Sequence, residues 1–285
     1  MTSSTSGDHD MDFLAKKNCH IKDNNLVFFP DTHIYKVVSD QQLKMTSTTT
    51  FVSKLFPKFD AAHMSRQIAN GKKSRDPKSE YFGMTENTIQ QMWETSGIKA
   101  AELGTALHER IEHMMNISSI SSNQELYTLL QKNTSVDDPL EWQYFLRFLS
   151  EYPHLVPYRT EWRIFDATNQ MAGSVDMLYF DPETNTYDIY DWKRTKDILY
   201  ENVYETLLDD LVKHIPNSTF HKYSLQLNVY KYILETAYQF PIGKMRLVRL
   251  HPDTETKSYE LYECPDYQRE VAALFHNQTP TRESR

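Results

Sequence analysis

The sequence predicts an α/β fold in which helices flank a mixed β-sheet. Three strand-like segments follow one another at residues 157–166, 171–181 and 186–195, and the turn sequences ATNQ and PETN between them predict an antiparallel meander. A helical segment at residues 218–239 and two further strand-like segments within residues 244–264 follow the meander. This order of helices, meander, helix and strand pair is typical of an α/β fold around a mixed sheet.

The elements before the meander are predicted from local signals. Residues 25–38 (NLVFFPDTHIYKVV) are typical of two short strands joined by a turn. Within residues 45–56, several Ser and Thr residues offer caps for a short helix that ends before Pro57.

Three further helices complete the expected order. The longest pattern covers residues 85–116, and we expect a break near Gly97. A second helix covers residues 139–152, with Pro139 at an allowed first-turn position. The last covers residues 266–277.

Composition and length favour one folded domain. The chain has 285 residues, of which 39% are hydrophobic and 13% aromatic, enough for a packed core. No convincing linker divides it, so we expect a single domain at residues 21–276 between flexible tails at 1–20 and 277–285.

The sequence also predicts an intracellular protein in a reducing compartment. Its polar N-terminus is neither a signal nor a transit peptide, and no apolar run approaches the roughly 18 residues of a membrane helix. Two cysteines, Cys19 and Cys264, cannot form a disulfide framework or a four-thiolate cluster.

Charge is unevenly distributed along the chain. The net charge of −8 argues against a protein that coats duplex nucleic acid with a basic surface. However, the loop at residues 70–79 (NGKKSRDPKS) is basic, and Lys72, Lys73 and Arg75 either contact phosphates or belong to an ordinary solvated loop. The acidic segment at residues 199–211 would repel phosphates, so nucleic acid would bind on one side only.

Two predicted strands place charges among residues that face the core. In YDIYDWKRTK, Asp191 and Lys193 share a face with Ile189, and in MAGSVDMLYF, Asp176 shares a face with Leu178. Two aspartates on neighbouring strands repel each other unless a cation lies between them, and carboxylate oxygens suit Mg²⁺ or Mn²⁺. Lys193 would then meet the anion that the metal binds.

An ordinary surface ion pair is the alternative reading of Asp191 and Lys193, because such pairs are common on exposed strand ends. Gly173, three residues before Asp176, favours a site because glycine allows close approach of the backbone.

In order and spacing, these residues resemble the RecB-like branch of the PD-(D/E)XK nuclease superfamily, with its restriction-endonuclease-like core. The resemblance covers about residues 90–235, and the strand pair with TSTTTF is similar to viral and phage members. Each motif alone is weak, and their shared order carries the resemblance. The motifs are the G-x-x-x-H pattern ending at His108, Glu161 in TEWRIF, Gly173 to Asp176, Asp191-Trp192-Lys193, and the Q-x-x-x-Y pattern of Gln226 and Tyr230.

Two departures from the family pattern are visible. Val175 stands where the superfamily's name has proline, which changes nothing chemically. The four cysteines that hold an iron–sulfur cluster in some members are missing, so we expect no cluster here.

The resemblance implies a metal-dependent nuclease that hydrolyses DNA, in preference to RNA, at ends or on single strands during replication, repair or recombination. Asp176, Asp191, His108 and the backbone carbonyl of Trp192 would bind Mg²⁺ or Mn²⁺. Lys193 would orient the attacking water or neutralise charge on the phosphate.

The resemblance also implies groups around this centre. Gln226, Tyr230 and Arg194 would contact the substrate. Glu112 and Glu161 would either support the metal from outside its direct ligands or form ordinary salt bridges.

Several alternatives stay open. A lone helix histidine such as His108 is commonly structural, and Tyr230 belongs to a core-like stripe with Tyr223, Leu227 and Leu234. The protein could also be an RNA endonuclease of the cap-cleaving type, or an inactive nuclease-like module that binds nucleic acid. The intact Asp, Asp and Lys set argues against an inactive module, which has no need of repelling carboxylates.

Overall fold

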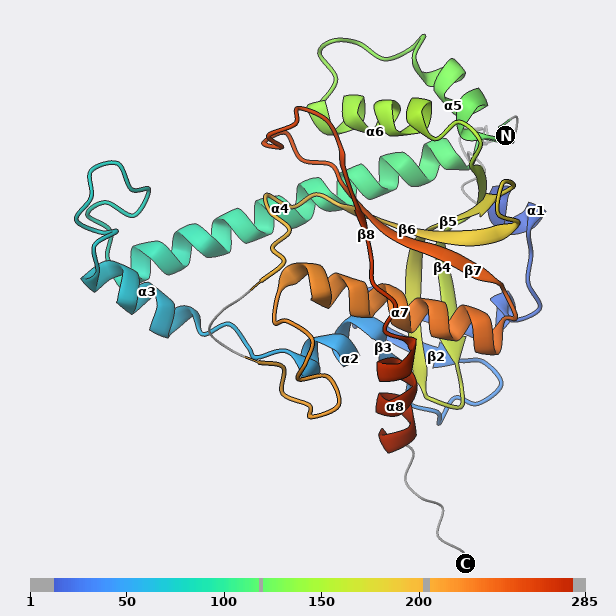
Figure 1. The fold of residues 1–285 in the computed structure, drawn as a ribbon, viewed down its shortest axis with the longest axis horizontal. Coiled ribbons are helices and arrows are strands. Elements are labelled where there is room, and N and C mark those ends of the chain that lie inside the picture. Colours follow the sequence, from blue (N-terminus) through green and yellow to red (C-terminus); the bar gives the residue numbers. More distant parts are fainter. Residues whose placement is uncertain (1–12, 118–119, 202–205, 279–285) are drawn as a thin grey trace, which may run out of the picture. The chain divides into compact units, whose positions relative to one another are not determined.

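The α/β class predicted from the sequence is confirmed by the computed structural model, which describes residues 13–117, 120–201 and 206–278 (Figure 1). Most of the two expected tails, residues 1–12 and 279–285, lies outside these ranges. Part of the expected N-terminal tail is ordered, because Phe13–Lys17 forms helix α1. Its Leu14 is buried, and the Leu14 backbone N–H donates to Asn116 Oδ1 at 3.0 Å.

The main sheet has six strands and is mixed, as predicted. Strands β4, β5 and β6 form the antiparallel meander, β7 pairs with β6 in parallel and with β8 antiparallel, and β3 pairs with β5 in parallel. Helix α7 lies between β6 and β7 in the sequence and forms the crossover connection that a parallel strand pair requires. The strands are β3 (Thr46–Ser47), β4 (Val156–Asp166), β5 (Met171–Asp181), β6 (Thr186–Lys193), β7 (Ile242–Arg249) and β8 (Glu260–Glu263).

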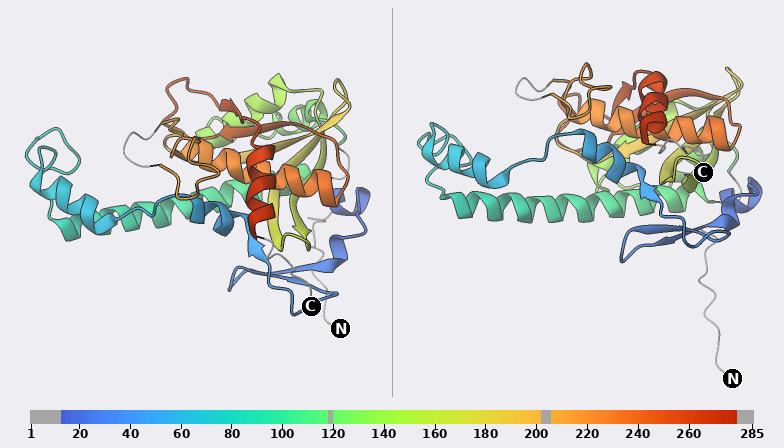
Figure 2. Two further views of the ribbon diagram at one scale, coloured as in Figure 1. Left: turned by 60° about the horizontal axis from the view of Figure 1, so that its bottom comes forward. Right: turned by 90° about the horizontal axis from the view of Figure 1, so that it is seen from below.

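Helices pack on both faces of this sheet (Figures 1 and 2). Ile189 of β6 belongs to the hydrophobic cluster shared with α2, α7 and α8, whereas Tyr190 and Trp192 belong to the cluster shared with α5, α6 and the last turns of α4. This alternation is the period-two pattern of a strand buried on both faces. The helices are α2 (Thr48–Leu55), α4 (Glu86–Met115), α5 (Asn123–Leu130), α6 (Leu140–Glu151), α7 (Thr219–Ala237) and α8 (Gln268–Gln278).

The predicted N-terminal strand pair forms a separate two-stranded sheet. Strands β1 (Leu26–Phe29) and β2 (Ile34–Val37) pair antiparallel after a short 3-10 turn, η1 (Asp23–Asn25). The hairpin packs against Phe165 and Ala172 of the main sheet.

Helix α4 is continuous, so the break expected near Gly97 is wrong. A glycine inside a helix costs about 1 kcal/mol relative to alanine, but it keeps its N–H donor and does not interrupt the ladder as proline does. Within the described ranges, no helix combines the length and apolar character needed to cross a lipid bilayer.

The chain divides into two compact units, one formed by residues up to Phe56 and from Leu107 onward, the other by Pro57–Ala106. The predicted single domain at residues 21–276 does not anticipate the second unit. No Gly- or Pro-rich linker marks its C-terminal boundary, because α4 itself runs across that boundary. The second unit contains α3 (Ala61–Asn70), which the sequence analysis missed, the basic loop and the first turns of α4.

Candidate metal centre

Three acidic residues lie at the same step of three neighbouring strands. Glu161 on β4 and Asp176 on β5 each lie between the paired residues Thr160–Met177 and Trp162–Val175. The β5–β6 register, extended one residue beyond Met177 and Tyr190, places Asp176 opposite Asp191. Asp176 and Asp191 lie close enough for the charge of Asp176 to raise the pKa of Asp191, and Glu161 on β4 lies beside Asp176.

The backbone is irregular where this row begins. Glu161 has a φ of 46°, in the left-handed region that a non-glycine residue rarely adopts inside a strand. Such a conformation costs on the order of 1–3 kcal/mol and is found most often at functional sites. The Ser174 hydroxyl donates to Glu161 Oε2 at 3.2 Å and helps to hold the side chain.

Helix α4 contributes His108 to the acidic row. Its Nδ1 lies 3.4 Å from Glu161 Oε1 and 3.7 Å from Asp176 Oδ2, and its Nε2 lies 2.9 Å from the Trp192 carbonyl oxygen. The Trp192 backbone N–H donates to Asp176 Oδ2 at 3.0 Å. Ligand atoms of His108, Glu161 and Asp176 all lie within 4.8 Å of one another, an arrangement that could hold one cation.

Asp191 and Lys193 lie next to this group on β6. The Asp191 side chain is only 2% exposed, and the Lys193 ammonium forms an ion pair with it. That ion pair engages Asp191 Oδ2, whereas Oδ1 accepts no hydrogen bond from the described part of the chain. A buried carboxylate with unused acceptor capacity is costly, and a bound cation would satisfy it.

The charges of these groups shift one another's pKa. Burial, followed by the Asp176 charge, raises the pKa of Asp191 to about 6. Burial also raises the pKa of Asp176. For His108, burial lowers the pKa, but the Asp176 and Glu161 carboxylates outweigh burial and raise it to about 9. At neutral pH the His108 imidazolium therefore supplies part of the positive charge that the carboxylates require.

Helix α7 closes one side of the centre. Gln226 Nε2 donates to the Tyr230 hydroxyl at 3.1 Å. Tyr230 is buried, and after burial itself the charges of Asp176 and Asp191 are the next causes that raise its pKa. A Cβ atom at Gly173 would lie 2.5 Å from Tyr230 Cε1, so the close approach predicted at this glycine is confirmed.

Among the described residues, the cluster of ligand atoms within 4.8 Å of one another contains neither Asp191, which lies beside it on β6, nor the other predicted site residues. Glu112 is half-buried one turn after His108, and the metal-ligand cluster of described residues does not include it. Arg194 Nε donates to Glu141 Oε1 at 2.8 Å, and this largely buried ion pair already occupies its guanidinium. Lys72, Lys73 and Arg75 are exposed in the second unit.

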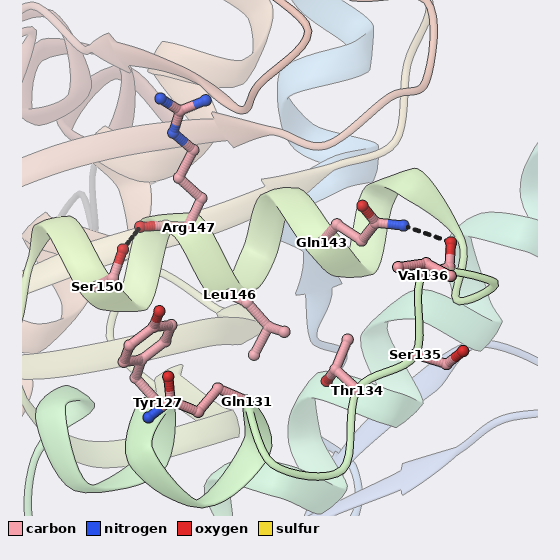
Figure 3. Close-up of a pocket in the computed structure, with 9 residues that line it drawn as sticks. All are labelled: Tyr127, Gln131, Thr134, Ser135, Val136, Gln143, Leu146, Arg147 and Ser150. Carbon is pink, nitrogen blue, oxygen red and sulfur yellow. Dashed lines mark hydrogen bonds between the residues drawn. The ribbon is translucent and has the colours of Figure 1, made fainter.

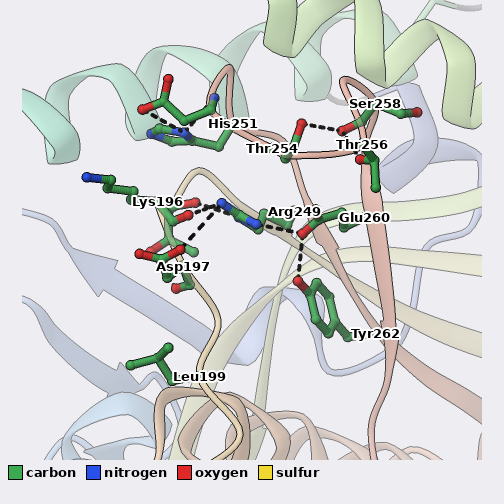
Figure 4. A network of polar contacts seen from close by, with 12 residues as sticks. Lys196, Asp197, Leu199, Arg249, His251, Thr254, Thr256, Ser258, Glu260 and Tyr262 are labelled. Carbon is green, nitrogen blue, oxygen red and sulfur yellow. Dashed lines mark hydrogen bonds and ion pairs between the residues drawn. The ribbon is translucent and has the colours of Figure 1, made fainter.

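Two contacts near Lys193 were missed in the sequence analysis. The Lys193 ammonium lies 4.6 Å from the centre of the Tyr223 ring on α7. Arg249 at the end of β7 braces the segment that follows Lys193: its Nε donates to the Thr195 carbonyl at 2.9 Å, and its Nη1 pairs with Glu260 at 2.6 Å (Figure 4). Neither contact has a sequence signal, because each joins segments that only the folded sheet brings together.

A pocket of about 360 Å³ lies between α5, α6 and the loop that joins them (Figure 3). Mostly polar side chains, including Gln131, Gln143 and Arg147, line it, and none of the predicted site residues does.

Comparison with protein-family models gave no match to this chain, and comparison with curated proteins gave none either. The functional interpretation therefore depends on the chemistry of the centre and on the motifs in the sequence.

Proposed function

We propose that the protein is a divalent-metal-dependent nuclease that hydrolyses phosphodiester bonds of DNA. The observation that carries the proposal is the fully buried Asp191 and the largely buried Asp176 on neighbouring strands beside Lys193. Asp191 Oδ1 accepts no hydrogen bond from the described residues, which suits a cation with oxygen ligands such as Mg²⁺ or Mn²⁺.

His108, Asp176, Asp191 and the Trp192 carbonyl would hold the ion, and the contact between His108 and Glu161 adds Glu161 to this set. A bound divalent ion polarises a phosphate oxygen and lowers the pKa of its water. The His108 ring gives up a proton when it becomes a ligand, because a protonated imidazole has no free lone pair.

Lys193 would act on the substrate. Its ammonium is held between the Asp191 carboxylate and the Tyr223 ring, so it is already oriented before substrate arrives. A fixed positive charge at this position stabilises the negative charge that develops on the phosphate oxygens during hydrolysis. The buried Trp192 side chain on the opposite face fixes the strand between the two catalytic residues.

A cleavage assay tests the proposal. The full chain is incubated with 5′- and 3′-labelled single- and double-stranded DNA and RNA, in Mg²⁺, Mn²⁺ or chelator. We expect DNA cleavage with either metal and none in chelator. Cleavage restricted to RNA would replace DNA with RNA as substrate, and no cleavage of any strand with either metal would overturn the proposal.

A further inference from the structure

The second unit carries a connected aromatic cluster. The Trp93 ring of α4 lies 5.5 Å from the Phe59 ring and 6.3 Å from the Tyr81 ring, and Trp93 Nε1 donates to the Tyr81 hydroxyl at 3.3 Å. The Lys73 ammonium lies 5.7 Å from the centre of the Tyr81 ring. The cluster therefore connects α4 to the basic loop within the second unit.

This cluster is more exposed than a small structural core requires. Phe59 is 70% exposed, and Phe82, which follows Tyr81, is 53% exposed. In contrast, Ile89 of the same unit is fully buried. The unit can therefore bury an apolar side chain, yet it leaves Phe59 and Phe82 exposed to solvent. Exposed aromatic rings that adjoin a partly buried aromatic cluster indicate a binding surface.

Positive charge accompanies these rings. The loop at residues 70–79 contains Lys72, Lys73, Arg75 and Lys78 against the single acid Asp76, in a chain whose net charge is −8. The ligand should therefore combine negative charge with flat apolar faces. Single-stranded nucleic acid has both, because its phosphates pair with cations and its unpaired bases stack on aromatic rings. Duplex DNA hides its base faces inside the stack.

We propose that the second unit binds single-stranded DNA, with bases stacked on Phe59 and Trp93 and phosphates paired with Lys72, Lys73 and Arg75. The choice of DNA rests on the proposed nuclease function, but the binding itself requires neither metal nor cleavage.

Trp93 offers a direct reporter of this binding. Of the four tryptophans, Trp142, Trp162 and Trp192 are at most 2% exposed, so a base that stacks on the surface can quench only Trp93. Full-length protein with Lys193→Ala, in chelator, is titrated with oligo(dT), with duplex DNA and with oligo(U). We expect fluorescence quenching by oligo(dT), and a Kd for oligo(dT) at least tenfold tighter than for the duplex.

Three substitutions distinguish base stacking from nonspecific binding. Phe59→Ala should weaken oligo(dT) binding about tenfold, since base stacking on one aromatic ring contributes roughly 1–3 kcal/mol. Phe29→Ala is the matched control, because Phe29 is also exposed (43%) with Lys36 Nζ 5.4 Å from its ring, yet belongs to the other unit. Trp93→Phe should abolish quenching while fluorescence anisotropy still detects binding.

The outcomes are distinct. Equal Kd values for Phe59→Ala and Phe29→Ala, duplex binding as tight as oligo(dT) binding, or an absence of quenching would each overturn the inference. Tighter binding of oligo(U) would overturn the assignment to DNA. If the metal-loaded protein binds single strands but cleaves nothing, the nuclease proposal is refuted and the binding surface is supported. If the protein cleaves DNA but Phe59→Ala leaves the Kd for oligo(dT) unchanged, the binding surface is refuted and the nuclease proposal is supported.

Discussion

Asp176 could be selected from the sequence as a candidate site residue because it shares a strand face with core residues, and the same argument applies to Asp191 and Lys193. The close contact of Glu161 with His108 was not predictable in detail. It depends on a left-handed backbone conformation inside β4 and on a helix distant in sequence, and neither follows from period-two alternation.

Lys193→Ala should abolish cleavage while metal still binds, because the ammonium acts on the phosphate and not on the ion. We expect kcat to fall at least about 100-fold, which is the usual effect of removing a charge-stabilising group. Metal titration by calorimetry should give a Kd within about threefold of the unmodified protein. Lys196→Ala is the control, since Lys196 is an exposed lysine three residues later. Loss of metal binding in folded Lys193→Ala would show that the assigned role is wrong.

Metal affinity should rise with pH up to about 9. The pKa of His108 is raised from 6.5 to about 9, so below that value one proton must leave the ring before it can bind a metal. The Kd for Mn²⁺ should tighten by about tenfold per pH unit between 7 and 9 and then level off, as measured by calorimetry.

In the metal-free protein, the contribution of His108 to folding stability should fall as pH rises. A folded-state pKa above the unfolded value means that protonated His108 stabilises the fold fully below about pH 6.5, and that this contribution is lost as pH rises through about 9. His108→Ala should make both metal affinity and folding stability less dependent on pH. If the Kd for Mn²⁺ varies with pH in this variant as it does in the unmodified protein, His108 is purely structural.

At the level of elements, the meander and helix α7 were predictable because turn signals and helical periodicity agree with the final packing. Helix α5 was missed although Ser122 caps it and Glu125 follows three residues later, the signature of a capping box. Strand β3 has only two residues, too short for any periodic signal, and it exists because it pairs with β5.

Gly173→Ala should destabilise the sheet where it meets α7. The new methyl group would lie 2.5 Å from Tyr230 Cε1 and 2.9 Å from Thr48 Oγ1, and overpacking of this kind costs about 1–3 kcal/mol. Urea denaturation would measure the loss. Gly97→Ala is the matched control: its Cβ meets nothing within 4 Å, and alanine inside a helix should stabilise by about 0.5–1 kcal/mol. Equal stability of the two variants would contradict the close contact at Gly173.

For the whole molecule, all the motif residues except Gly104 belong to the first unit, and Gly104 lies just before the boundary within α4. The boundary of the second unit could not be predicted from the sequence, because α4 runs across Ala106 without a break. Within this unit, the positive charge of the loop at residues 70–79 was the one sequence feature that predicted phosphate binding.

Reversal of Lys72, Lys73 and Arg75 to glutamate should weaken DNA binding and flatten its salt dependence. Each single-strand phosphate contact contributes about 0.7 to the slope of log K against log salt, so the loss of three should reduce the slope by about 2. Fluorescence anisotropy across a salt series would measure it, and cleavage of already bound substrate should change less. Identical slopes for the variant and the unmodified protein would exclude phosphate contacts by this loop.

The central claim is that Asp176 and Asp191 form a metal site and do not merely balance Lys193. Thermal melting of the unmodified protein and of Asp176→Asn, each in chelator and in Mn²⁺, tests it most directly. Because the folded protein raises the pKa of Asp176, it disfavours this charge, so Asp176→Asn in chelator should melt at or above the unmodified protein. Mn²⁺ should raise the melting temperature of the unmodified protein, since a ligand bound only by the folded state stabilises it, and should have little effect on the variant. If Asp176→Asn instead melts clearly lower in chelator, and Mn²⁺ shifts both proteins alike, Asp176 is a structural ion-pair partner and the metal site is refuted.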